Sequence, residues 1–352
     1  MNQIVKTGFA LIGAGLFGEQ HARAYQRHPA VAFEVVCDLD PARAEIIATR
    51  YGARRWTTDL GAVLDDSTIQ AVSVATPDHA HRDVAIACLR AGKHVLLEKP
   101  LATNLQDALA IAAVAGRSSG KLMLDFHNRL NPPMVAARDA VAAGQLGQPS
   151  YVYARLSNRL DVPQQMLGWS KHSSALWFLG SHMIDVVCWI LGERPIRVYA
   201  LKRDSVLSAR GIPTADFHIA VLEFPSGVVA TFEHAWILPR GQLAVKDLKL
   251  EILGSDGAVY IDGSHNRALE VYSGEVGRFQ DVLVPAYGPR LTGFVLDAIA
   301  AFVAVVTEDG PLLATVADGV ANTLIIEHIG ASADAGGRPL SIDWSAMAHL
   351  AS

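Results

Sequence analysis

Three glycines near the N-terminus have the spacing of a phosphate-binding turn. Residues 13–18 read Gly-Ala-Gly-Leu-Phe-Gly, and the apolar run that precedes them is typical of a strand. In a G-x-G-x-x-G turn, the first glycine permits the sharp bend, the second lets a pyrophosphate approach the backbone, and the third allows close helix packing. The N–H groups that open the next helix would then face the phosphates. The residues predicted to contact a dinucleotide here are Gly13, Gly15, Leu16, Phe17 and Gly18.

Asp38 lies twenty residues after Gly18, at the end of the second apolar run. A carboxylate at this point accepts hydrogen bonds from ribose hydroxyls. It would also repel the 2′-phosphate of NADP, and the next residues, Leu39 and Asp40, bring no compensating cation. The pattern predicts NAD as the cofactor, with NADP disfavoured. The alternatives are a purely structural glycine turn and an Asp38 that caps the helix opening near Pro41, although Asp40 is better placed for capping.

Two further polar motifs follow later strands of the same half. Residues 75–81 read Ala-Thr-Pro-Asp-His-Ala-His, and residues 98–100 read Glu-Lys-Pro. Both lie at the carboxyl ends of strands, where ligands bind in open parallel sheets. A lysine there can hydrogen-bond a substrate hydroxyl, or pass protons if its pKa is depressed. From spacing alone, a solvated Lys99 beside a helix-starting Pro100 is an equally good interpretation.

The elements that would position these residues alternate between strand and helix. Short apolar runs separated by helical stretches predict βαβ units around a buried parallel sheet. The expected strands are 8–15, 33–38, 71–76, 94–98 and 121–126, and the expected helices are 16–28, 41–51, 79–91 and 104–118. Later runs predict β-hairpins, with strands at 150–156, 196–203, 217–224, 228–232, 248–253 and 258–261, and two closing helices at 292–307 and 314–331.

Taken together, these motifs resemble the Gfo/Idh/MocA family of oxidoreductases. The resemblance rests on the glycine turn, Thr-Pro-x-x-x-His at 76–81, Ala-Gly-Lys-His-Val at 91–95 and Glu-Lys-Pro at 98–100, and it runs through residues 8–130. It implies an α/β fold with a doubly wound N-terminal Rossmann domain, 1–127. A C-terminal α+β domain, 128–352, would carry a large open, mostly antiparallel sheet. Around the motifs, the implied cofactor contacts are Ala75, Thr76, Pro77, His81, Glu98, Lys99 and Asn128.

The family's helix motif D-x-G-x-H-x-x-D matches the segment 178–185 in all but one position. His182 falls on the motif histidine and Asp185 on the final aspartate, whereas Phe178 replaces the first aspartate. A histidine with a pKa near its ordinary value of about 6.5 can take a hydroxyl proton at neutral pH. By resemblance, Lys99 and His182 are the catalytic pair, and Asp185 binds substrate. The substitution at Phe178 disfavours inositol and favours a glycoside, an anhydrosugar or a sugar with an apolar portion.

Several other side chains suit a sugar. Asn128 and Arg129 match the family's polar pair near nicotinamide and substrate, and aromatic faces stack on sugar C–H groups. The remaining substrate-binding candidates are Trp169, Lys171, His172 and Trp236. For each tryptophan, a core or dimer position is an equally good interpretation.

The predicted activity is NAD-dependent oxidation of a hydroxyl group of a sugar, glycoside or polyol by hydride transfer. Two alternatives stay open: NAD-dependent glycoside cleavage through transient oxidation and elimination, and a sugar sensor without catalysis. The resemblance also implies a homodimer or homotetramer, assembled through the outer face of the antiparallel sheet.

The composition of the chain limits the classes of binding partner and the cellular compartment that we expect. The chain has 352 residues, 30 Lys and Arg against 35 Asp and Glu, and 51% apolar residues, which excludes a disordered chain and disfavours a nucleic-acid partner. Three widely spaced cysteines, no metal-ligand spacing and no long apolar run predict a cytoplasmic protein without a bound metal or a membrane partner.

Overall fold

The computed structural model describes residues 6–273, 276–280, 283, 286–287, 290–348 and 350. The chain forms two compact units. The first contains Met1–His127, Val295–Val320 and Leu350–Ser352, and the second contains Asn128–Phe294 and Ala321–His349. Each unit is described by itself.

The first unit is built on a six-stranded parallel sheet in the order β3-β2-β1-β4-β5-β6. This is the strand order of a dinucleotide-binding fold, whose switch point lies between β1 and β4. The central strands are almost wholly buried, because helices cover both faces and the runs are apolar throughout. The strands are β1 (Thr7–Ile12), β2 (Val31–Cys37), β3 (Arg55–Thr57), β4 (Ala71–Val74), β5 (His94–Leu97) and β6 (Leu122–Leu124).

The helices of this unit confirm the predicted alternation. They are α1 (Leu16–Arg27), α2 (Pro41–Tyr51), α3 (Leu60–Leu64), α4 (His81–Arg90) and α5 (Leu105–Ala115), with a 3-10 turn, η1 (Asp78–Ala80), before α4. The pattern of apolar runs does not predict β3, because this edge strand has only three residues and two of them are exposed.

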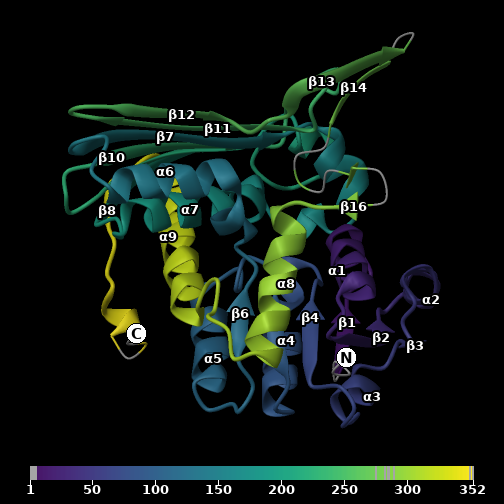
Figure 1. Ribbon diagram of the computed structural model, residues 1–352. Coiled ribbons are helices and arrows are strands. Elements are labelled where there is room, and N and C mark those ends of the chain that lie inside the picture. Colours follow the sequence, from purple (N-terminus) through teal and green to yellow (C-terminus); the bar gives the residue numbers. More distant parts are fainter. Residues whose placement is uncertain are drawn as a thin grey trace. The chain divides into compact units, whose positions relative to one another are not determined.

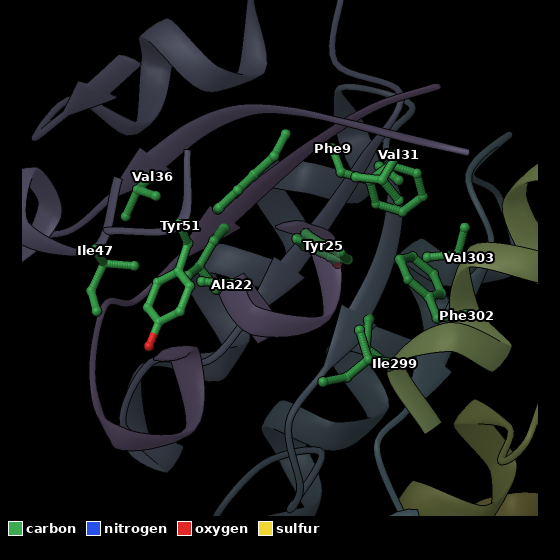
Figure 2. Packing of buried hydrophobic residues seen from close by; sticks show 14 of the residues in the cluster. Phe9, Ala22, Tyr25, Val31, Val36, Ile47, Tyr51, Ile299, Phe302 and Val303 are labelled. Carbon is green, nitrogen blue, oxygen red and sulfur yellow. The ribbon is translucent and has the colours of Figure 1, made fainter. Parts of the chain in front are cut away.

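A helix from the C-terminal part of the chain completes the core of the first unit. Phe302 of α8 (Phe294–Thr307) meets Phe9 of β1 edge to face, with ring centroids 6.0 Å apart. Figure 2 shows Ile299, Phe302 and Val303 pointing toward the strand and helix residues of this cluster. From the sequence, 292–307 is expected to belong to the second domain, whereas Val295–Val320 belong to the first unit. The difference arises because the chain returns to cover apolar surface that its own first 127 residues leave open.

The second unit contains a seven-stranded sheet in the order β12-β11-β7-β10-β9-β8-β17, mixed but mostly antiparallel. Only β7 and β10 pair in parallel. The predicted hairpin of β9 and β10 forms, with Glu223 opposite Val229. The strands are β7 (Pro149–Asn158), β8 (Arg197–Arg203), β9 (Phe217–Glu223), β10 (Val229–Ala235), β11 (Lys246–Gly254), β12 (Ala258–Asp262) and β17 (Leu340–Ser341). Two short pairs, β13 (Asn266–Ser273) with β14 (Val276–Gln280) and β15 (Ala286–Tyr287) with β16 (Arg290–Leu291), stand outside this sheet.

Helices cover one face of this sheet, as Figure 1 shows for α6 (Pro132–Ala142) and α7 (Ser181–Leu191). Helix α9 (Val316–Asp334) begins in the first unit and continues into the second. Residues alternate between the buried face and the outer one, where Tyr199, Leu201 and Ile219 are about two-fifths exposed. The remaining short turns are η2 (His127–Leu130), η3 (Val162–Met166), η4 (Ser170–His172), η5 (Leu176–Gly180), η6 (Ser208–Arg210) and η7 (Ser345–Met347).

Within the described ranges, no helix combines the length and apolar character needed to cross a bilayer. The homodimer or homotetramer expected from the resemblance stays a prediction, as does the cytoplasmic location.

Truncation of Phe302 tests whether α8 belongs to the core of the Rossmann unit. We expect Phe302→Ala to destabilise the protein by about 3–5 kcal/mol, because it removes a fully buried ring and leaves a cavity. Denaturant unfolding followed by circular dichroism measures this change. Ile46→Ala on the exposed side of α2 is the control and should cost under about 1 kcal/mol. Equal small effects in both variants would contradict the packing.

Candidate functional site

The glycine turn between β1 and α1 is shaped by close backbone approach. Gly13 has φ +98°, and a Cβ at this position would lie 2.5 Å from the Ala75 carbonyl oxygen. A Cβ at Gly18 would lie 1.9 Å from the Gly13 carbonyl oxygen, so α1 can start this close to β1 only with glycine there. At Gly15, by contrast, a Cβ would meet nothing within 4 Å. Gly15 therefore borders open space rather than protein.

Asp38 is held beside this turn by backbone hydrogen bonds. Its Oδ2 accepts from the Ala14 N–H at 2.6 Å, and its Oδ1 accepts from the Asp40 N–H at 2.9 Å. The cap of α2 is Asp40, whose side chain accepts from the N–H groups of Ala42 and Arg43. The Asp38 carboxylate therefore lies at the glycine turn, and the residue that caps α2 is Asp40, not Asp38.

The segment after β4 forms the next part of this edge. The Oγ1 of Thr76 is buried and has no hydrogen-bond partner within the described part of the chain. His81 opens α4 and joins two motifs: its Nδ1 lies 2.7 Å from the Pro100 carbonyl oxygen and its Nε2 lies 3.1 Å from the Thr76 carbonyl oxygen. Burial lowers the pKa of His81. His81 therefore links the backbone at Thr76 to the backbone at Pro100.

Lys99 follows β5 and is only 5% exposed. Its Nζ lies 6.0 Å from the centre of the Phe17 ring, which belongs to the first turn of α1. Burial lowers the pKa of Lys99, and the carboxylates of Glu98, Asp78 and Asp125 oppose that shift. The lysine is therefore buried among acidic groups, and it is not the solvated side chain that spacing alone allowed.

These features fit a dinucleotide. The N-cap Gly15 offers no side chain to the first N–H groups of α1, so these N–H groups are available to a phosphate. The open space at Gly15 would admit a pyrophosphate, and the orphaned Thr76 hydroxyl can pair with a bound group. The two oxygens of Asp38 keep lone pairs beyond those used by Ala14 and Asp40, as ribose hydroxyls require.

In the second unit, His182 lies in the first turn of α7. The preceding segment, η5, is a single π-helical turn, a feature that is frequent at functional sites. A Cβ at Gly180 would come within 3.1 Å of the His234 ring, so glycine lets η5 approach β10. His182 itself is 7% exposed.

Two neutral histidines lie in the sheet beneath this helix. His234 of β10 is opposite His218 of β9, and its Nδ1 donates to the Leu156 carbonyl oxygen at 3.1 Å. Burial lowers the pKa of each to about 4, and the neighbouring ring adds to the effect at His218. Both imidazoles are therefore uncharged at neutral pH.

Arg129 and Asp185 form a buried bidentate ion pair. Arg129 Nη2 donates to Asp185 Oδ1 at 2.6 Å, and Arg129 Nε donates to Asp185 Oδ2 at 3.0 Å. Such fork-to-carboxylate geometry is strong and directional. It joins the start of the second unit to α7, which carries His182.

Phe178 lies between two tryptophan rings. Its ring centroid is 5.9 Å from that of Trp169 and 5.9 Å from that of Trp236, both at tilted or edge-to-face angles. Trp236 is fully buried, whereas Trp169 and Phe178 are half-buried. Trp236 therefore supports the Phe178 ring from within the core.

The other sequence-predicted residues are placed less distinctively. Asn128 is buried, and its Oδ1 accepts from Asn131 Nδ2 at 3.4 Å. Lys171 and His172 are exposed in the turn η4. The structure groups Gly13, Asp38, Thr76 and Lys99 within the first unit and groups Arg129, Phe178, His182 and Asp185 within the second.

Sequence spacing did not reveal one buried polar cluster. His21, Glu98 and Asp125 each place one ligand-type atom within 4.8 Å of the others, although they come from α1, the end of β5 and the end of β6. His21 Nε2 lies 3.0 Å from Glu98 Oε1, which is a direct hydrogen bond rather than two ligands of one ion. The only signal in the sequence was the position of His21, one turn after Gly18 on the helix face that packs inward. The expected absence of a metal stays a prediction.

Comparisons with known proteins cover both units. Residues 7–126 match the family model described as an oxidoreductase family with an NAD-binding Rossmann fold, and residues 134–260 match a GFO/IDH/MocA C-terminal domain. The chain is 29% identical over 317 residues to an inositol 2-dehydrogenase of Rhizobium meliloti, covering 89% of this chain and 92% of the relative. It is 30% identical over 197 residues to a levoglucosan dehydrogenase of Pseudarthrobacter phenanthrenivorans, covering 52% and 50%.

A solved structure extends the likeness to nearly the whole chain. The structure of GenD2 from gentamicin A biosynthesis, in complex with NAD, has a TM-score of 0.84 and 28% sequence identity. The match covers 97% of this chain and 98% of that protein.

The buried histidines beneath α7 predict a loss of stability in acid. Because the folded-state pKa of each lies near 4, below the ordinary value of about 6.5, the unfolded chain binds more protons between these values. Above pH 6.5 the two histidines do not reduce the free energy of unfolding. As the pH is lowered toward 4, the free energy of unfolding falls by roughly 3 kcal/mol per histidine. Denaturant unfolding at several pH values measures it. The double variant His218→Asn/His234→Asn should show a shallower slope in this window, and an unchanged slope would contradict the assignment.

Proposed function

This chain belongs to the Gfo/Idh/MocA family of oxidoreductases, and from that premise we propose that it oxidises a hydroxyl group of a sugar, glycoside or polyol with NAD. The observation that carries the proposal is Lys99, a buried lysine at the carboxyl end of β5, whose Nζ lies 6.0 Å from the centre of a ring in the first turn of α1. A lysine buried beside a dinucleotide turn suits an uncharged polar substrate that reacts with the dinucleotide. The relatives' names, an inositol and a levoglucosan dehydrogenase, support the same class.

In this proposal, His182 and Lys99 divide the work at the reacting hydroxyl. The imidazole of His182 takes the hydroxyl proton as the C–O bond becomes a carbonyl. The ammonium of Lys99 donates a hydrogen bond to the same oxygen and stabilises the negative charge that develops on it. The bound cofactor supplies the hydride acceptor. The ion pair of Arg129 and Asp185 keeps α7, and with it His182, in place.

Asp38 is proposed to select NAD. Its carboxylate is oriented by the N–H groups of Ala14 and Asp40, so it cannot turn away from a ribose bound at this turn. The nearest basic side chain along the chain, Arg43, is paired with Asp40. A 2′-phosphate would therefore meet an uncompensated negative charge.

Phe178 is proposed to set the substrate class. At this position, the family motif has an aspartate that could bind a hydroxyl, and this chain presents a ring supported by Trp169 and Trp236. An apolar wall one turn before His182 suits a substrate with an apolar face, such as an anhydrosugar or a glycoside with an apolar aglycone. The same apolar wall would leave one hydroxyl group of a free cyclitol without a hydrogen-bond partner.

Removing either proposed catalytic side chain tests the activity. We expect Lys99→Met and His182→Asn each to lower kcat by about 10²-fold or more, the usual scale of acid–base catalysis. NADH formation is followed with a panel of sugars, glycosides and cyclitols. Lys249→Met in β11, whose side chain is 37% exposed, is the control for loss of a lysine and should leave turnover unchanged. Near-normal rates in both test variants would overturn the assignment, and product release without NADH would indicate elimination instead.

Neutralising Asp38 tests the cofactor preference. Asp38→Asn keeps an acceptor for the Ala14 and Asp40 N–H groups but removes the charge. We expect the ratio of kcat/KM for NAD to that for NADP to fall about tenfold or more, which corresponds to about 1.4 kcal/mol. Steady-state kinetics with both cofactors measures the ratio. Asp40→Asn keeps the helix cap and is the matched control, for which the ratio should change little.

Restoring the motif carboxylate tests the role of Phe178. We expect Phe178→Asp to raise kcat/KM for myo-inositol relative to levoglucosan by about tenfold or more, since a pocket gains a partner for a hydroxyl and loses an apolar surface. Phe178→Leu keeps the apolar character and should not favour the cyclitol. If the two variants give the same substrate ratio, the ring does not set the substrate class.

A further inference from the structure

A chain of buried hydrogen bonds connects the helix after the glycine turn to the residue before Lys99. His21 of α1 is fully buried, and its two ring nitrogens contact different elements. Nδ1 lies 2.8 Å from the Ser73 hydroxyl of β4, and Nε2 lies 3.0 Å from the Glu98 carboxylate at the end of β5. The Tyr25 hydroxyl, also on α1, hydrogen-bonds the same Ser73.

The direction of these hydrogen bonds follows from the groups involved. An ionised carboxylate only accepts, so His21 Nε2 carries the proton that is donated to Glu98. His21 Nδ1 shares a hydrogen bond with the Ser73 hydroxyl, which also hydrogen-bonds the Tyr25 hydroxyl. Burial raises the pKa of Tyr25. The chain of hydrogen bonds therefore runs from Tyr25 through Ser73 and His21 to Glu98, and it ends with the donation from His21 Nε2 to the Glu98 carboxylate.

Glu98 needs this support because it is buried among several charged groups. Burial alone would raise its pKa, but the hydrogen bond from His21 and the proximity of His21, His127 and Lys99 hold it below the ordinary value. The groups that act on Lys99 are Glu98, Asp78 and Asp125. Asp125 follows β6, and its Oδ2 lies 3.8 Å from His21 Nε2, while its Oδ1 lies 3.7 Å from His127 Nδ1. Burial and the Glu98 charge raise the pKa of Asp125, whereas the pKa of Glu98 is lowered, so the two buried carboxyl groups shift in opposite directions.

We propose that His21 is a positioning residue for Lys99: through its buried hydrogen bond it holds the Glu98 carboxylate aligned at the end of β5, where Glu98 is the adjacent counter-charge of the lysine. The proposal rests on the proposed function of Lys99. In this proposal α1 has two roles. It begins at the glycine turn, and through His21 it also positions the carboxylate of Glu98, the residue before Lys99. His21 need not contact substrate or cofactor.

Two substitutions of His21 separate its two hydrogen bonds. The amide of His21→Gln reaches the position of Nε2 and can still donate to Glu98, whereas the amide of His21→Asn reaches the position of Nδ1 and keeps only the Ser73 contact. We expect His21→Asn to lower kcat at least tenfold with little change in KM for NAD, and His21→Gln to lose about threefold or less. Supporting residues that orient a functional group commonly carry effects of 10–100-fold.

A second measurement does not depend on turnover. Competitive acylation with acetic anhydride reports the pH at which Lys99 becomes a neutral, reactive amine. Because trypsin does not cleave after an acylated lysine, the informative peptide spans residues 91–117, and tandem mass spectrometry separates the label on Lys99 from that on Lys93. Glu98→Gln removes the counter-charge, so the half-point of labelling should move to lower pH by about one unit. We expect His21→Asn to move it in the same direction and His21→Gln to leave it near the wild-type value.

The outcomes distinguish the positioning role from a structural one. If both His21 variants lower the melting temperature but neither changes the labelling half-point, His21 only packs, and the proposal is wrong. Equal losses of kcat in the two variants would also overturn it, because the Glu98 bond would then be irrelevant. If the wild-type enzyme oxidises none of the tested alcohols while the labelling shifts occur as expected, the proposed function fails and the link between His21 and Lys99 stands.

Discussion

The close approach of α1 to the end of β1 is the constraint on which the first unit depends. The Gly13 carbonyl oxygen occupies the space that a Cβ at Gly18 would need, so the helix can start here only with glycine. Three consequences follow from this one contact. The N-terminal N–H groups of α1 face open space at Gly15, the Phe17 ring reaches Lys99, and His21 reaches both Ser73 and Glu98. A bulkier residue at Gly18 would displace all of them together.

Each unit contains a buried polar group that positions a chemically useful one. In the first, His21 pairs with Glu98, the residue before Lys99, and in the second the ion pair of Arg129 and Asp185 joins the start of the unit to α7. Burying such groups is costly unless every donor and acceptor is paired. Arg129 was expected to bind substrate, but two of its hydrogen bonds go to Asp185, which was expected to do the same. Their pairing stabilises the helix on which His182 lies.

The Phe178 ring illustrates how an apolar substitution is accommodated. Trp236, directly after β10, is fully buried, and its ring and that of Trp169 each contact the Phe178 ring. Gly180, two residues after Phe178, lets η5 approach His234. The ring at the position of the motif aspartate is therefore packed against aromatic neighbours.

The sequence by itself determined the alternation of strands and helices, the glycine turn and the motif positions of Lys99, Asp38 and His182, because these depend on local periodicity and on short spacings. It did not reveal that α8 would complete the first core, since Phe302 and Phe9 are 293 residues apart and each reads only as an apolar residue. For the same reason, the meeting of His21 with Glu98 and of Arg129 with Asp185 was not visible. Hydrogen bonds between distant polar residues depend on which strands become neighbours, and tertiary structure alone decides that.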